Sequence, residues 1–272
     1  MTLLWAAVQQ AWEPFVLVVG LLLIGHLAAK DGLFEVAGSR LADLPGGPAV
    51  LLVALMLLVA LVTAVLNLDT SIVFLTPVLL HTARSRSVPE GPFLYGCIFM
   101  SNAASLLLFG SNLTNILVFT HSGVAGTTFA ATMFLPWILS VALTTLVVLG
   151  WFRRDLTPRP RSPNPADVGF TWGLGLAGVV VATTLMLVLT DPAAPVLGAA
   201  LVLIAYDVGV RHRLALRPLL RSANLPAVSG LFVLAVSVSM VSRHWHIARH
   251  LESAWVSWRR SSLVLSGRLG LI

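Results

Sequence analysis

The sequence predicts an all-α polytopic membrane protein, and three observations support this. Of its 272 residues, 57% are hydrophobic and only 10% are charged, and the mean hydropathy is +0.92. Soluble domains contain about 45–50% apolar residues. Apolar runs of roughly the 20 residues that a helix needs to cross a bilayer recur between short charged loops. These runs are continuous in Leu, Val and Ala, whereas the strands of a β-barrel alternate.

The charge distribution favours membrane topology over nucleic-acid binding. The formal net charge is +6, but the arginines occur in loop clusters without interleaved aromatic residues. Clusters of this kind mark loops on the inner side of a membrane; here they are Arg153, Arg154, Arg159 and Arg161, then Arg211, Arg213, Arg217 and Arg221. The single cysteine, Cys97, excludes an intramolecular disulfide and a multi-thiolate metal site. We expect neither a metal nor a cofactor.

The apolar runs define the expected elements in chain order. Residues 1–13 form a short N-terminal segment, and residues 33–44 are an amphipathic stretch with the pattern of an interfacial helix. The apolar runs themselves are residues 14–29, 48–66, 70–83, 91–121, 130–152, 169–190, 193–209 and 224–242.

Two of these runs have unusual lengths. A helix over 70–83 would rise only about 21 Å, which is too little to cross a bilayer, so we expect 48–83 to form a re-entrant hairpin. A helix over 91–121 would rise about 46 Å, too long for one crossing and too short for two with a turn. This run is therefore predicted to be one crossing that is broken in the middle.

Each of these two segments contains a polar interruption. In the first, Asn67, Asp69 and Thr70 lie where the two arms meet. In the second, Gly110 is expected to permit the backbone torsions that interrupt the helix, and it introduces a polar group consisting of Ser111, Asn112, Thr114 and Asn115. Unpaired polar groups in hydrocarbon cost several kcal/mol each, so they persist inside protein or against a water-filled cavity. A carboxylate costs at least about 2.5–3.5 kcal/mol there and indicates function. Two alternatives remain: hydrogen bonds between helices, or an Asp69 in a turn at the far membrane surface.

The sequences of these interruptions resemble a known family. The segments LNLDTSIVFLTP and FMSNAASLLLFGSNLTNIL, in this order, resemble the re-entrant hairpin and the discontinuous helix of the arsenite permease family. That family belongs to the ion transporter superfamily, with NhaD-type sodium/proton antiporters and divalent-anion/sodium symporters. The segment LLLIGHLAAKDGLFEVAG is similar to the stretch that precedes the hairpin in these proteins.

The resemblance implies an inverted-repeat transporter in the inner (plasma) membrane. In this reading residues 14–152 are the first transport repeat and 153–168 a cytoplasmic linker. Residues 169–242 are an incomplete second repeat, because no second hairpin follows, and 243–272 are an atypical tail rich in Arg, His, Trp and Ser. Besides the lipid bilayer, the resemblance implies one of two protein partners: a second copy of the chain or an arsenite-stimulated ATPase subunit.

The function implied is proton-coupled efflux of arsenite or antimonite, with Asp69 as the proton-coupling group and the seven polar residues of the two interruptions as the binding site. Arsenite is an uncharged trihydroxide at neutral pH, so a cleft of Asn, Ser and Thr suits it and no Lys or Arg is needed near either interruption. The alternatives are a sodium/proton antiporter that uses the same Asp69, or a truncated remnant without transport. An enzyme would need His and carboxylate groups at one depth, whereas the histidines lie near the predicted span ends.

Overall fold

The computed structural model describes residues 3–119, 124–156 and 173–211, and residues 229, 230, 232, 233, 236 and 237. The predicted tail 243–272, most of the linker 153–168 and most of the run 224–242 lie outside them. The described residues are helices and turns without strands, which confirms the all-α prediction. Within the described ranges, four segments are long and apolar enough to cross a membrane: Trp12–Lys30, Pro48–Val65, Gly126–Phe152 and Ala193–Val210.

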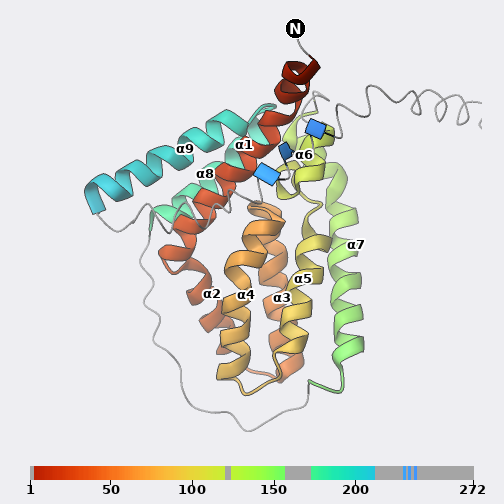
Figure 1. Ribbon diagram of the computed structural model, residues 1–272. Coiled ribbons are helices and arrows are strands. Elements are labelled where there is room, and N and C mark those ends of the chain that lie inside the picture. The colour runs from red at the N-terminus through yellow and green to blue at the C-terminus, as the bar shows by residue number, and fades with distance from the viewer. Residues whose placement is uncertain are drawn as a thin grey trace, which may run out of the picture. The chain divides into compact units, whose positions relative to one another are not determined.

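Figure 1 shows how the helices are arranged, and short connections join most of them up to α7. They are α1 (Leu3–Lys30), α2 (Leu33–Ala42), α3 (Pro48–Val65), α4 (Leu68–Ser85), α5 (Gly91–Ala104), the 3-10 turn η1 (Phe109–Ser111), α6 (Leu113–Phe119), α7 (Gly126–Phe152), α8 (Leu174–Val188), α9 (Ala193–Tyr206) and the π-helical turn η2 (Asp207–Arg211). The chain forms two compact units, residues 13–225 and residues 1–12 with 226–272. The site described below belongs to the first unit.

Helix α5 is the centre of the larger unit. It packs against α3, α4 and α7, which lie side by side in Figure 1. Its residues Phe93, Cys97, Met100 and Ala104 are fully buried. Their spacing of three and four residues places them on one helical face. The opposite face of α5 exposes apolar side chains such as Tyr95 and Phe99, as a helix in contact with lipid does.

The predicted hairpin 48–83 corresponds to α3 and α4. Pro48 occupies the first turn of α3, where its missing N–H costs nothing. The turn is short, because α3 ends at Val65 and Asn67 already caps α4. Helix α4 has 18 residues and rises about 27 Å. It is longer than the apolar run 70–83, because the Asn67 cap starts the helix earlier and polar residues continue it to Ser85. Its length therefore does not show that it re-enters the membrane, and the re-entrant hairpin remains a prediction.

The predicted crossing 91–121 is not one helix. Helix α5 ends at Ala104, the chain passes through turns into η1, and α6 begins at Leu113. The interruption and the α3–α4 turn lie at the same end of the helix group, since η1 packs against α3.

Helices α1 and α8 approach each other closely. A Cβ atom on Gly175 of α8 would lie 2.3 Å from the Cα of Ala28 in α1, so only a glycine allows this contact. Helix α1 also covers the start of α4, because a Cβ atom on Gly25 would lie 2.4 Å from Cγ2 of Thr70. The start of α4 is therefore enclosed by protein on this side.

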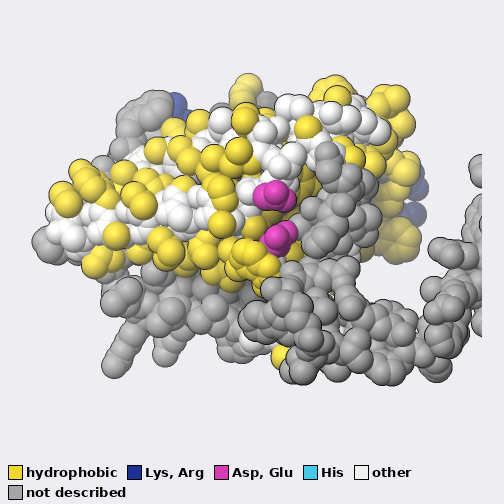
Figure 2. Space-filling model, turned by 90° about the horizontal axis from the view of Figure 1, so that it is seen from above, with side chains coloured by type: hydrophobic (Ala, Val, Ile, Leu, Met, Phe, Trp, Pro, Cys, Tyr) yellow, Lys and Arg dark blue, Asp and Glu magenta, His cyan; other side chains and the backbone are white. Residues whose placement is uncertain are grey.

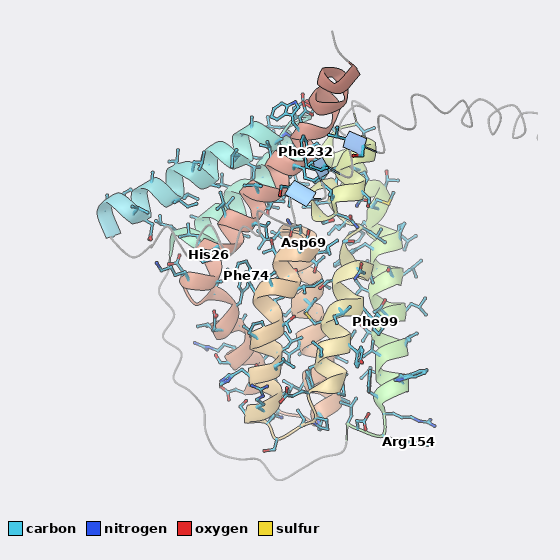
Figure 3. All side chains as sticks on the ribbon, in the orientation of Figure 1. His26, Asp69, Phe74, Phe99, Arg154 and Phe232 are labelled. Carbon is cyan, nitrogen blue, oxygen red and sulfur yellow. The ribbon has the colours of Figure 1, made fainter. Side chains whose placement is uncertain are left out.

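Basic residues expected on the inner side lie at one end of the larger unit. Arg154 lies at the end of α7 that is near the α4–α5 turn (Figure 3). At this turn Arg84 pairs with Glu90, and the Arg86 guanidinium donates hydrogen bonds to the carbonyls of the α2–α3 loop. This arrangement agrees with the orientation that the arginine clusters predict.

Candidate functional site

The start of α4 is built by Asn67. Its Oδ1 accepts a hydrogen bond from the Thr70 N–H at 2.7 Å, so Asn67 caps the helix, a position for which Asn is strongly preferred. The Asn67 side chain is 1% exposed and that of Thr70 is 0% exposed. Yet Asn67 Nδ2 and Thr70 Oγ1 have no hydrogen-bond partner. Since almost all buried polar atoms are paired, two unpaired atoms at the start of one helix indicate a place for a ligand or water.

A second layer of hydrogen bonds supports this helix start. Thr63 Oγ1 of α3 donates to Ser71 Oγ at 2.8 Å, and Ser71 Oγ donates to the Asn67 carbonyl at 3.1 Å. Both hydroxyls are fully buried and satisfied by protein. They tie α3 to α4 and leave the unpaired atoms of Asn67 and Thr70 in place. Thr63 and Ser71 are not among the predicted site residues, although they too are polar residues in an apolar run.

Asp69 differs from its neighbours because its side chain is exposed. It lies in the first turn of α4, where a negative charge is favoured by the helix dipole (Figure 3). Within the described residues it forms no salt bridge. An acidic group thus lies in the first turn of α4, close in sequence to Asn67 and Thr70.

The polar residues of the broken helix are held differently. Asn112 caps α6, because its Oδ1 accepts from the Thr114 N–H at 3.0 Å and from Thr114 Oγ1 at 2.9 Å. Asn112 Nδ2 donates to Ser105 Oγ, and Asn115 Nδ2 donates to the Ser105 carbonyl at 2.9 Å. Ser111 is fully buried and donates to the Leu108 carbonyl. This group is internally satisfied, and Ser105, which the sequence analysis did not select, is its centre.

Gly110 has a different role from the one expected. It was expected to supply unusual backbone torsions, but it is not among the described glycines with a positive φ. Instead, a Cβ atom there would lie 2.3 Å from Sδ of Met186 in α8. A side chain at position 110 would force Met186 to move, so Gly110 contributes to the close packing of the break against α8.

The structure brings the seven predicted residues together in two groups. Asn67, Asp69 and Thr70 form one group, and Ser111, Asn112, Thr114 and Asn115 form the other. In the described part of the chain no hydrogen bond joins the two groups. They share one end of the helix group, and a common binding cavity between them remains a proposal.

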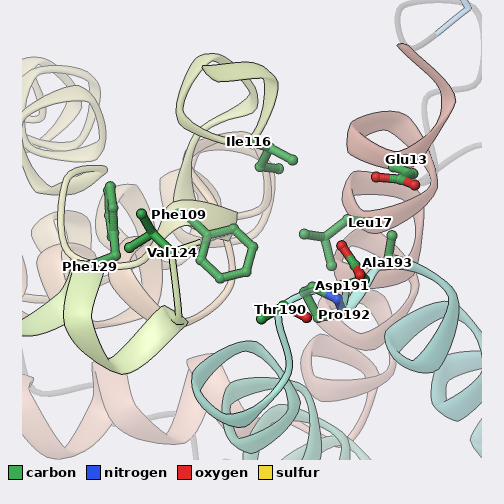
Figure 4. A pocket seen from close by; sticks show the side chains of 10 residues that line it. All are labelled: Glu13, Leu17, Phe109, Ile116, Val124, Phe129, Thr190, Asp191, Pro192 and Ala193. Carbon is green, nitrogen blue, oxygen red and sulfur yellow. The ribbon is translucent and has the colours of Figure 1, made fainter. Parts of the chain in front are cut away.

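A pocket also lies against the broken helix, on residues other than the predicted ones (Figure 4). Its volume of about 20 Å³ has room for about one water molecule. Phe109 and Phe129 give it an apolar wall, while Glu13 and Asp191 add two carboxylates (Figure 4). Seen from above in Figure 2, acidic side chains (magenta) lie among mostly hydrophobic ones. The full lining is Glu13, Leu17, Phe109, Ile116, Val124, Phe129, Thr190, Asp191, Pro192 and Ala193.

Among the described residues, no group of three His, Cys, Asp or Glu side chains could hold a metal ion. The polar groups at the two interruptions are amides, hydroxyls and one carboxylate. Such groups bind a small solute through hydrogen bonds.

Several apolar helices long enough to cross a membrane, with polar side chains at two interruptions between helices, are typical of polytopic membrane transporters. The chain belongs to the citrate transporter family (CitMHS), whose model matches residues 2–241. This match confirms that the chain is a member of the ion transporter superfamily and that its family is one of transporters.

Curated relatives include arsenical pump membrane proteins. One from Escherichia coli is 32% identical over 160 residues, which is 57% of this chain and 36% of that protein. A second from Escherichia coli is 30% identical over 159 residues, again 57% and 36%. An uncharacterized transporter of Mycobacterium tuberculosis (strain H37Rv) is 26% identical over 150 residues, which is 55% of this chain and 35% of that protein. The chain thus covers about a third of the curated relatives it matches. No solved structure gives a significant match.

Proposed function

We propose that this chain takes part in the efflux of arsenite or antimonite across the inner membrane, coupled to protons through Asp69. The observation that carries the proposal is the pair of buried, unpartnered polar atoms, Asn67 Nδ2 and Thr70 Oγ1, beside the Asp69 carboxylate. The identities of 30% and 32% with arsenical pump membrane proteins support the choice of substrate.

The chemistry of the start of α4 suits an uncharged polyhydroxide. Asn67 Nδ2 is a donor, Thr70 Oγ1 is both donor and acceptor, and Asp69 is an acceptor when ionised. Arsenite as its trihydroxide carries both donors and acceptors, so it can pair with each of these groups. An exposed Asp69 can release a proton as the substrate binds and take one up as it leaves, which would couple the two movements.

Citrate is a second candidate, because it is the substrate in the family's description. A tricarboxylate needs cationic partners or a bound cation. Of the described helices around the two interruptions, α3, α5, α6, α7 and α8 contain no Lys or Arg, while α1 and α4 carry theirs in their last turns, at Lys30 and Arg84. This favours arsenite over citrate as the solute.

The proposal includes the finer architecture. Helices α3 and α4 are proposed to form a re-entrant hairpin within the first repeat, residues 14–152, with residues 169–242 as part of an inverted second repeat. The seven polar residues of the two groups would then face one cavity inside the membrane. A second copy of the chain or an arsenite-stimulated ATPase subunit is a possible partner of this assembly.

The test is arsenite resistance and arsenite content in a strain that lacks its own efflux system. The whole chain is expressed beside Asp69→Asn and Thr70→Val, with Asp155→Asn and Thr132→Val as matched controls on other surfaces. We expect the wild type and both controls to lower cellular arsenite and both site variants to lose this effect. Equal arsenite content in cells with the wild type, Asp69→Asn and an empty vector would exclude the proposal.

Two further measurements separate the alternatives. If membrane vesicles that contain the protein take up labelled citrate but do not transport arsenite, citrate is favoured as the substrate. Sodium-dependent acidification of the same vesicles, without arsenite protection in cells, would favour a sodium/proton antiporter that uses Asp69.

A further inference from the structure

The end of α5 is held by side chains from α7. Trp137 Nε1 donates to the Ala104 carbonyl at 3.0 Å, and Ser140 Oγ donates to the Ala103 carbonyl at 3.0 Å. Trp137 and Ser140 are three residues apart, so both project from one face of α7. Together with Asn115 Nδ2, which donates to the Ser105 carbonyl, they supply one donor to each of three successive carbonyls.

These carbonyls are the ones that a continuing helix would use. In an uninterrupted α-helix the carbonyls of Ala103 and Ala104 would accept from the N–H groups of Leu107 and Leu108. In the structure these two N–H groups donate no hydrogen bond to any described residue. The donors of α7 thus stand where the next turn of α5 would have placed its own N–H groups.

We propose that Trp137 and Ser140 are positioning residues that end α5 at Ala104 and keep residues 105–112 out of the helix. The proposal extends the proposed function, because it names the element that keeps the second polar group open. The break is then set by a helix that follows it in the chain. It also follows that the end of α5 offers a solute fewer free carbonyls, since three of them already accept from protein groups.

The physical basis is competition for the carbonyls. Ala104 is fully buried, so its carbonyl needs a donor. When the Trp137 donor is present, that need is met without a further turn of helix. When it is removed, the nearest available donors are the free N–H groups of residues 107 and 108, and their use extends α5 by one turn.

Hydrogen–deuterium exchange of the full chain in lipid nanodiscs tests this proposal. The variants are Ser140→Ala, Trp137→Phe and their combination, with Ser140→Thr as the conservative variant that keeps a hydroxyl donor. We expect amide exchange at residues 107–109 to slow at least tenfold in the double variant and less in each single one. Ser140→Thr should keep the wild-type rate.

Two matched controls on α7 remove the same kinds of group elsewhere. Trp151 is 81% exposed, and the Thr132 hydroxyl donates to Thr128 within α7, so Trp151→Phe and Thr132→Val should leave exchange at 107–109 unchanged. Unchanged or faster amide exchange at residues 107–109 in Ser140→Ala overturns the proposal. If the double variant does not reach the membrane, the result for Ser140→Ala alone decides whether the proposal holds. The readout needs no transport, so the positioning role and the proposed function can fail separately.

Discussion

The carboxylate of Asp31 accepts a hydrogen bond from the backbone N–H of Gly175 at 2.7 Å, across 144 residues of sequence. Asp31 directly follows α1 and Gly175 lies in the first turn of α8. The first N–H groups of a helix lack partners within the helix, and a negative charge is favoured beside them. Asp31 therefore acts as a cap that fixes the start of α8 on the end of α1.

Removing this cap should destabilise the protein. We expect Asp31→Ala to lower the free energy of unfolding by about 1–2 kcal/mol, the usual cost of losing a capping side chain. Asp31→Asn retains an acceptor and should lose less. Thermal denaturation in detergent measures the effect, with the exposed Asp155→Ala as control. Equal melting temperatures for Asp31→Ala and Asp155→Ala would contradict the capping role.

A larger residue at position 175 should separate α8 from α1. The new Cβ atom of Gly175→Ala would lie 2.3 Å from Cα and 2.6 Å from the backbone nitrogen of Ala28, and neither atom can rotate away. We expect a loss of about 1–3 kcal/mol, as for other overpacked sites. Gly198→Ala in α9 is the matched control, because nothing lies within 4 Å of its Cβ position. The control should be neutral or stabilising by up to about 1 kcal/mol.

Asn67→Ser should separate the stability of α4 from the proposed binding role. Serine caps helices about as well as asparagine, so we expect the melting temperature to change little. The variant lacks the buried Nδ2 donor, and arsenite efflux should fall to the level of an empty vector. Asn67→Ala, which removes cap and donor together, should lower both quantities. Normal efflux by Asn67→Ser would show that Nδ2 contacts no substrate.

The pair at the α4–α5 turn gives a pH dependence with a definite sign. The Arg84 guanidinium donates to the Glu90 carboxylate at 2.6 and 3.0 Å and lowers the pKa of Glu90 below its ordinary value of 4.5. Folding thus favours the ionised form, so the contribution is present above pH 4.5 and is lost as the pH falls through the lowered pKa.

Because both side chains are exposed, this contribution is small and salt-sensitive. The measurement is the difference in the free energy of unfolding between the wild type and Glu90→Gln, taken between pH 3 and pH 7 at low and at high salt. We expect a small advantage of the wild type at pH 7 and low salt that shrinks in acid or in salt. An advantage that grows in acid would contradict the assignment.

Local signals in the sequence predicted much of the fold. The predicted run 48–66 matches α3 closely, with Pro48 in its first turn, whereas α4 begins at Leu68 and not at residue 70, because Asn67 caps it. The end of α5 was not predictable in this way. It depends on Trp137 and Ser140, more than 30 residues further along the chain.

The site was predicted in part for the same reason. Asn67 and Thr70 stand out as polar residues in an apolar run, and the structure leaves one buried polar atom unpaired in each. Ser105 is one serine among several in its segment, and its central place appears only when α5 ends and α6 turns back toward it. Gly110 was selected correctly as special but for the wrong reason, since its neighbour Met186 comes from α8.

The apolar surface of α7 governs how the protein can be handled outside a bilayer. Leu135, Leu146 and Trp151 are 64%, 67% and 81% exposed, and the buried residues of this helix are only Gly126, Phe129, Val141 and Val148. Helix α7 is roughly 40 Å long. A detergent micelle that is thinner than this would leave apolar side chains at one end of the helix exposed to water and would promote aggregation. Purification should therefore begin with long-chain maltosides, before any crystallisation or cryo-microscopy trial.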